Sequence, residues 1–140
     1  MALHCIDASF VAAWLIPDQR NQNVGEAWLA YLESNEDLIS PSLMYFEAIS
    51  ALRHAELRHS ITKDQTLEAI HHLISLPISQ LSPSNLYAHA YEESKKYSFS
   101  NVYDACYVAL AQILSCELLT LDKRLYNAVS RDFSKVKLIE

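Results

Sequence analysis

The sequence predicts an α/β fold, a three-layer α/β/α sandwich built on a five-stranded, mainly parallel sheet. Short apolar runs alternate with longer segments of helical periodicity along all 140 residues. The apolar runs lack polar alternation, which is typical of strands buried on both faces. Such an alternation implies right-handed crossovers with helices on both faces of the sheet. The hydrophobic content of 51% supplies a core, and the length suits a single domain over residues 1–140.

The strands are predicted where an apolar run is short and bounded by polar or turn-forming residues. The first run ends at Asp7 and the fourth ends at Asp122, while Pro77 stands just before the third. The five predicted strands are residues 3–6, 37–40, 78–81, 117–121 and 136–139.

The helices are predicted from apolar spacing and from start and stop signals. Pro17 ends the first helix, Pro41 with Ser42 starts the third, and Thr62 is a candidate cap for the fourth. Ser100 and Asn101 are candidate caps for the sixth. The predicted helices are residues 8–15, 21–34, 41–59, 63–75, 82–97, 102–115 and 123–129.

Composition excludes several classes of protein. The chain has one glycine, Gly25, so neither a P-loop nor a dinucleotide-binding loop is present. Cys5, Cys106 and Cys116 stand in apolar contexts without a CxxC pair, which favours reduced core thiols and a cytoplasmic location. No apolar run approaches the ~20 residues that span a bilayer, and no signal peptide or membrane association is expected. The net charge of −6 is unusual for a nucleic-acid-binding protein.

Four isolated carboxylates are the candidate functional residues. Asp7 and Asp122 follow apolar strands, Asp104 opens a stretch without charge, and Glu47 lies inside an apolar helix. Carboxylates are rarely buried without a compensating charge. Ligands of open α/β sheets bind beyond the carboxyl ends of the strands, so we expect the four to meet there.

A divalent cation is the most natural counter-charge for such a cluster. Mg²⁺ and Mn²⁺ prefer oxygen ligands, and two such ions ~3.5–4 Å apart hydrolyse phosphodiester bonds. A simpler interpretation remains for three of the residues, because Asp7, Asp104 and Asp122 each stand where an acid caps a helix or faces its dipole. Glu47 has no such explanation.

Other catalytic arrangements are less well supported. The six histidines are scattered, and no GxSxG elbow is present for a Ser–His–Asp site. Tyr87, Tyr91, Tyr97, Tyr103 and Tyr107 fall near helical spacing, for which core or interface packing is the default and base stacking a minority interpretation. A receiver domain or a haloacid-dehalogenase-type phosphatase also places Asp after a first strand. A receiver needs a neighbouring acid pair and a late-strand lysine, and the phosphatase needs a second Asp where Ser9 stands, so neither fits.

Four stretches make the sequence similar to the PIN-domain ribonucleases, the family that includes the VapC toxins. They are residues 5–9, 45–48, 103–111 and 119–125, and the resemblance extends over essentially the whole chain. The resemblance implies a parallel sheet flanked by helices, RNA cleavage that depends on Mg²⁺ or Mn²⁺, a homodimer and, for toxins, inhibition by a small antitoxin. Its metal-binding acids fall on Asp7, Glu47, Asp104 and Asp122.

The resemblance adds two hydroxyls to the expected site and leaves out one acid. The family's hydroxyl positions fall on Ser9 and Thr120, which would donate to the carboxylates, while Tyr126 lies where some members have a fifth acid. Lys123 and Arg124 either contact phosphate or simply begin a solvated helix. The leading hypothesis is a metal-dependent endoribonuclease; the alternative is a PIN-like scaffold or interaction domain with little catalysis.

Overall fold

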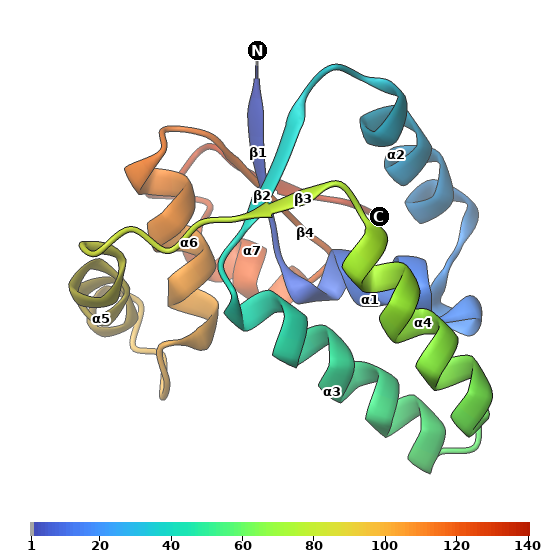
Figure 1. The fold of residues 1–140 in the computed structure, drawn as a ribbon. Helices are drawn as coiled ribbons and strands as arrows, with labels where there is room; N and C mark the ends of the chain where they lie inside the picture. The colour runs from blue at the N-terminus through green and yellow to red at the C-terminus, as the bar shows by residue number, and fades with distance from the viewer. Residues whose placement is uncertain (1) are drawn as a thin grey trace.

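The computed structural model describes residues 2–140 and has the predicted α/β architecture (Figure 1). Within these residues, five strands form one sheet: β1 (Leu3–Ile6), β2 (Asp37–Ser40), β3 (Ile78–Gln80), β4 (Glu117–Thr120) and β5 (Val136–Leu138). Their order is β3-β2-β1-β4-β5, and each neighbouring pair is parallel. The five predicted strands are thus confirmed, although the last three each end one residue earlier than expected.

The helices lie where the sequence predicts them, with differences at their ends. They are α1 (Ala8–Leu15), the short 3₁₀ helix η1 (Pro17–Gln19), α2 (Gln22–Glu33), α3 (Leu43–Leu57), α4 (Lys63–Ser75), α5 (Leu86–Lys96), α6 (Tyr103–Ile113) and α7 (Lys123–Val129). Several are shorter than predicted because capping residues stand at the ends of the predicted ranges. Asn21 is one of these, since its side chain accepts a hydrogen bond from the backbone of Val24. The predicted start of α5 at Ser82 is wrong, since this helix begins four residues later, after Asn85.

The predicted caps are confirmed in one case and corrected in another. Thr62 caps α4 in a capping box with Gln65, in which each side chain bonds the other residue's backbone N–H. The N-cap of α6 is Val102, which has no polar side chain. Asn101 still contributes there, because its side-chain oxygen accepts from the Tyr103 N–H at 3.0 Å.

The helices pack as two groups around the sheet (Figure 1). Helix α1 contacts α2, α3 and α4, whereas α5 packs mainly against α6. Phe10 of α1 stacks on Trp28 of α2 with ring centroids 4.6 Å apart, and the indole N–H donates to the Phe10 carbonyl. The three cysteines are free, and Cys5 and Cys116 are buried as expected, whereas Cys106 is only partly buried.

The strand order places a topological switch point between β1 and β4. The chain passes from β1 to β2 and β3 on one side, then returns to β4 on the other side of β1. Asp7 directly follows β1, and Asp122 follows β4 after one residue. The Asp7 N–H donates to the Leu119 carbonyl at 3.3 Å, which joins the two strand ends. Such a switch point is where open α/β sheets bind ligands.

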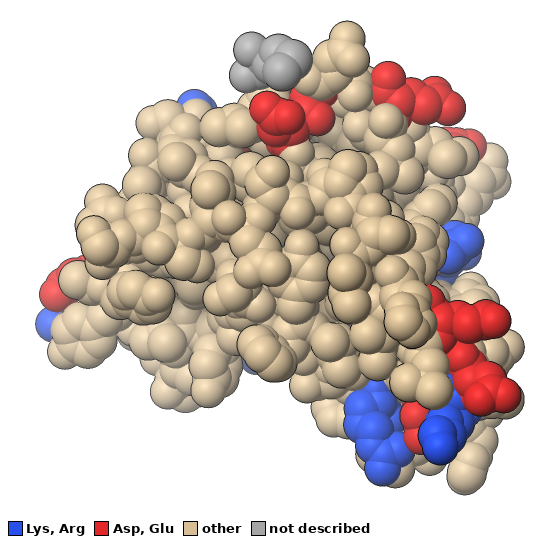
Figure 2. All heavy atoms as spheres, viewed as in Figure 1, with Lys and Arg blue, Asp and Glu red and all other residues tan. Residues whose placement is uncertain are grey.

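The outer surface carries charge unevenly. Figure 2 shows that the face seen in Figure 1 is mostly uncharged, with basic and acidic side chains gathered over the adjacent ends of α3 and α4. Some of these charges pair with each other, such as Arg53 with Glu56 at 2.9 Å. As for membrane segments, none of the helices described in residues 2–140 has the length and hydropathy to cross a bilayer.

Candidate metal centre

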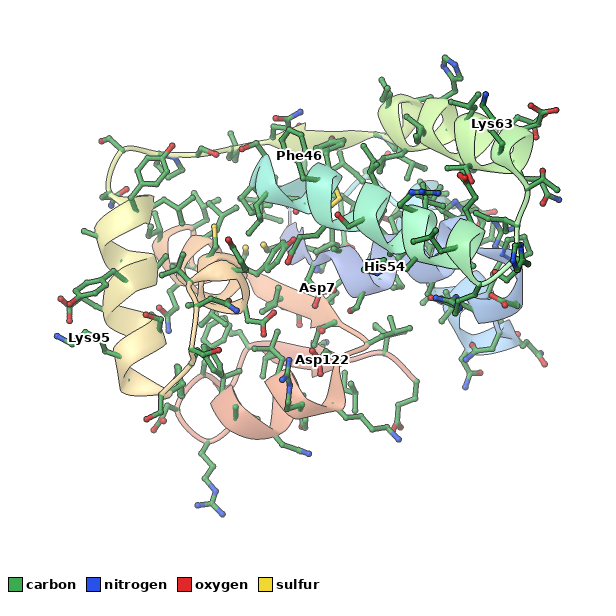
Figure 3. All side chains as sticks on the ribbon, turned by 90° about the horizontal axis from the view of Figure 1, so that it is seen from below. Asp7, Phe46, His54, Lys63, Lys95 and Asp122 are labelled. Carbon is green, nitrogen blue, oxygen red and sulfur yellow. The ribbon has the colours of Figure 1, made fainter. Side chains whose placement is uncertain are left out.

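The four carboxylates that the sequence singles out line one pocket at the carboxyl edge of the sheet. The pocket has a volume of about 230 Å³ and is lined by Asp7, Glu47, Asp104 and Asp122 together with Ala8, Ser9, Ala51 and Tyr107. We call it the carboxylate pocket. Figure 3 shows Asp7 and Asp122 near the middle of the molecule, with α3 running past them. Residues far apart in the chain are therefore brought to one place.

Asp7 is the most enclosed of the four carboxylates. It is 4% exposed, and both of its oxygens accept hydrogen bonds. Ser9 Oγ donates to Oδ1 at 2.6 Å, the Phe10 N–H donates to Oδ1 at 3.2 Å, and Thr120 Oγ1 donates to Oδ2 at 2.5 Å. Through the bond from the Phe10 N–H, Asp7 caps α1, as the capping interpretation predicts. The two hydroxyl bonds are not needed for capping, and they fix the orientation of the carboxylate.

Glu47 is held by a residue whose contribution the sequence argument missed. Glu47 lies on α3, away from the ends of that helix, and the Tyr107 hydroxyl donates to its Oε1 at 2.5 Å. Helical spacing predicts core or interface packing for Tyr107, and its side chain is buried with 1% exposure. It lies three residues after Asp104 on α6, so the two share a helix face. That spacing is the signal that would have placed Tyr107 in the site.

Asp104 and Asp122 both lie near one basic side chain, that of Arg124. Arg124 Nη2 lies 3.6 Å from Asp104 Oδ2 and 3.9 Å from Asp122 Oδ2. Asp122 also caps α7, since its Oδ1 accepts from the backbone N–H groups of Arg124 and Leu125. Asp104 opens a stretch without charge along the chain, yet folding brings Arg124 to it. Because the Arg124 side chain is 84% exposed, this pairing contributes little to stability.

Crowding and burial disfavour the ionised form of three of these carboxylates. Burial raises the pKa of Asp7 from 3.8 to about 6, although the bonds from Ser9, Thr120 and Phe10 oppose the rise. Burial raises the pKa of Glu47, a rise that Tyr107 opposes and Asp104 adds to. Burial and the nearby Asp122 raise the pKa of Asp104, while Arg124 opposes this. A bound cation would reverse this cost, because it favours the charged carboxylates.

The donor chemistry of the pocket suits a hard divalent ion. The four acids offer oxygen ligands only, and Mg²⁺ and Mn²⁺ prefer such ligands. As their side chains stand, however, no three Asp, Glu, His or Cys residues in residues 2–140 are arranged closely enough to hold one ion. The structure thus gathers the predicted acids in one pocket without forming a complete ligand group.

Comparison with known proteins agrees with this fold. The family model for the PIN domain matches residues 4–130. Ribonuclease VapC3 of Pyrobaculum aerophilum is 28% identical over 127 residues, which cover 86% of this chain and 89% of that protein.

Solved toxin structures also share the fold at low identity. Mycobacterium tuberculosis VapC20, a toxin that cleaves the sarcin–ricin loop, superposes with a TM-score of 0.65 at 15% identity, over 89% of this chain and 94% of its own. VapBC-1 of nontypeable Haemophilus influenzae gives 0.65 at 16% identity, over 97% of each chain. A toxin–antitoxin complex from Klebsiella pneumoniae gives 0.61 at 15% identity, over 98% of this chain and 96% of that one. The match of the family model to most of the sequence shows that this chain belongs to the PIN domain family.

Proposed function

We propose that this protein is an endoribonuclease that depends on Mg²⁺ or Mn²⁺ and acts as the toxin of a toxin–antitoxin pair. One observation carries the proposal: Asp7, Glu47, Asp104 and Asp122, from four separate segments, line one pocket at the switch point of the sheet. The name of the Pyrobaculum relative, a ribonuclease, supports the substrate class. When bound, a divalent ion would supply Lewis acidity and lower the pKa of an attacking water.

The residues of the chain have separable roles in this proposal. Asp7, Asp104 and Asp122 would be the principal ligands, with Glu47 binding the ion directly or through water and orienting the attacking water. Ser9 and Thr120 hold Asp7 through hydroxyl hydrogen bonds, and Tyr107 holds Glu47 in the same way. Such outer partners keep a ligand in position and tune its basicity.

The direct test is RNA cleavage with and without the metal. The purified chain is incubated with a mixture of single-stranded and hairpin RNAs, in Mg²⁺ or Mn²⁺ and separately in EDTA. We expect discrete cleavage products with either ion and none in EDTA. A protein that binds these RNAs but leaves them intact under all conditions would support the scaffold alternative instead.

Tyr107→Phe is expected to weaken metal binding without disturbing the core. The variant keeps the buried ring but removes the hydroxyl that lies 2.5 Å from Glu47 Oε1. That bond lowers the pKa of Glu47, so its loss leaves more of the residue protonated. We expect the affinity for Mn²⁺ to fall roughly 10-fold. Calorimetric titration measures the Mn²⁺ affinity of each protein. The difference in affinity between Tyr107→Phe and the unaltered protein should become smaller as the pH rises, because Glu47 then ionises fully.

The matched control is Tyr91→Phe, which removes a hydroxyl from an exposed ring on α5. Its Mn²⁺ affinity should equal that of the unaltered protein. An equal affinity for Tyr107→Phe at every pH would show that the bond to Glu47 does not support the metal site.

We further propose that the chain acts in the cytoplasm as a homodimer and binds a small antitoxin protein. The exposed apolar side chains Leu67 and Ile74 of α4 offer a surface for such a partner. The Klebsiella structure is a toxin–antitoxin complex, which supports the partner class. Analytical ultracentrifugation of the chain, alone and with the product of the neighbouring gene, tests the homodimer and the antitoxin complex. A chain that sediments as a monomer, with or without that product, would contradict both proposals.

A further inference from the structure

A second hollow lies beside the carboxylate pocket and carries two exposed aromatic rings. It has a volume of about 480 Å³ and is lined by one stripe of α3, which includes Phe46 and ends at His54, and by Tyr103 at the start of α6. We call it the aromatic groove. It shares Glu47 and Ala51 with the carboxylate pocket, so the two hollows are continuous. Figure 3 shows Phe46 near the start of α3, which then passes Asp7.

The two rings have no role in the core. Phe46 is 73% exposed and Tyr103 is 50% exposed. The buried face of α3 consists of other residues, among them Met44, Ala48 and Leu52. Each exposed ring also stands immediately before a carboxylate of the pocket, Phe46 before Glu47 and Tyr103 before Asp104. The rings are therefore held at a fixed, short spacing from the proposed reaction centre.

The charges around the groove favour a neutral, flat ligand. Among the described residues, its lining includes the carboxylate of Glu47 and the imidazole of His54 but neither lysine nor arginine, so it offers phosphate no counter-charge. The other flank of the carboxylate pocket differs. There a hollow of about 240 Å³ contains Arg124, Ser100 and Asn101 and shares Asp104 with the pocket.

The structure assigns the aromatic groove to an unpaired nucleobase of the RNA. We infer that Phe46 and Tyr103 stack on a base beside the phosphate that is cleaved, while the RNA backbone continues past Arg124 on the other flank. This inference builds on the proposed nuclease function and adds how the substrate is selected. A base can meet a ring face only when it is unstacked or splayed out, as in loops and single strands. The groove therefore favours single-stranded RNA over duplex.

Removing a ring should weaken RNA binding only when the matching base is present. The probe is a short oligoadenylate, compared with versions that carry an abasic nucleotide at each position in turn. Binding is measured in EDTA in the Asp104→Asn background, in which cleavage is expected to be strongly reduced. Because stacking of one base contributes about 1–3 kcal/mol, Phe46→Ala should weaken binding of the intact oligomer by roughly 5- to 150-fold. When the base that stacks on Phe46 is the one removed, Phe46→Ala should not weaken binding of that abasic oligomer any further.

Three further variants sharpen the test. Tyr103→Ala should behave like Phe46→Ala, and Phe46→Trp should keep or increase the affinity because it retains a ring. Tyr87→Ala is the matched control, since Tyr87 is 70% exposed on α5 and lies outside the groove lining. Its affinity should not change.

The outcomes separate this inference from the nuclease proposal. An equal loss for intact and abasic oligomers, or no loss in either ring variant, would overturn the stacking role even if the protein cleaves RNA. If sedimentation shows that Phe46→Ala converts a dimer to a monomer and base removal has no effect, the groove belongs to a second copy of the chain. Cleavage that persists in Asp104→Asn would contradict the proposed nuclease site. The stacking inference would still be tested in that case, because binding in EDTA does not depend on cleavage.

Discussion

Asp104→Asn is expected to reduce metal-dependent RNA cleavage by roughly 10²–10³-fold, the usual cost of removing one electrostatic contributor from an active site. Asp104 lines the carboxylate pocket from the first turn of α6, where it shares Arg124 with Asp122. Asparagine has nearly the same shape, but it lacks the negative charge that a divalent ion needs. The measurement is the initial rate of RNA cleavage at saturating Mn²⁺.

The variant should fold normally, because Asp104 is only half-buried and does not cap its helix. Thermal unfolding and circular dichroism check this point. Asp64→Asn is the matched control, since Asp64 lies in the first turn of α4 and is exposed. That variant should cleave at the normal rate. Cleavage by Asp104→Asn at an undiminished rate, still sensitive to EDTA, would remove Asp104 from the metal site.

Asp7→Asn is expected to stabilise the metal-free protein while abolishing cleavage. In the folded protein, burial raises the pKa of Asp7 to about 6 from an ordinary value of 3.8. A raised carboxylate pKa means that folding favours the protonated form, so ionisation destabilises the fold. This cost is absent below about pH 4, grows as the pH rises and is complete above pH 6. At about 1.4 kcal/mol per pKa unit, it reaches about 3 kcal/mol.

Asparagine is neutral at every pH, so the substitution should remove this cost. We expect the free energy of unfolding in EDTA to exceed that of the unaltered protein by about 3 kcal/mol at pH 7 and by almost nothing at pH 4. Urea unfolding across this range measures the difference. Mg²⁺ should stabilise the unaltered protein more than Asp7→Asn. A difference that does not change with pH would show that the charge of Asp7 does not destabilise the fold.

The structure explains why Asp7→Asn is expected to raise stability and at the same time abolish cleavage. Asp7 is buried at the end of β1, where two hydroxyls hold it and no Lys or Arg forms an ion pair with it among the described residues. A carboxylate is kept there at a cost to the fold, which agrees with the proposed role of Asp7 as a ligand of a divalent cation.

Local patterns in the sequence were sufficient to predict the elements. Short apolar runs fixed the strands, and helical spacing with residues such as Thr62 and Pro17 fixed the helices, because these signals act between residues close along the chain. The helix ends were less well predicted. Asn21 and Val102 hold N-cap positions, and capping is decided by backbone geometry as much as by residue type.

Contacts between distant segments lay beyond the sequence argument. His4 is an example, because it is buried in β1 with Nε2 2.7 Å from Glu36 Oε2 and Nδ1 3.0 Å from Glu117 Oε1. Nothing near His4 in the sequence predicts either partner. The pairing depends on strand order, since β2 and β4 lie on the two sides of β1.

By itself, the sequence determined the α/β class, the succession of strands and helices, and the four isolated acids as the candidate site. Only the tertiary structure decided the order β3-β2-β1-β4-β5, the bond of Tyr107 to Glu47 and the approach of Arg124 to Asp104. The physical reason is the distance along the chain over which each kind of interaction acts. Propensity and periodicity act over a few residues, whereas a pocket forms from side chains that are neighbours only after the sheet has assembled.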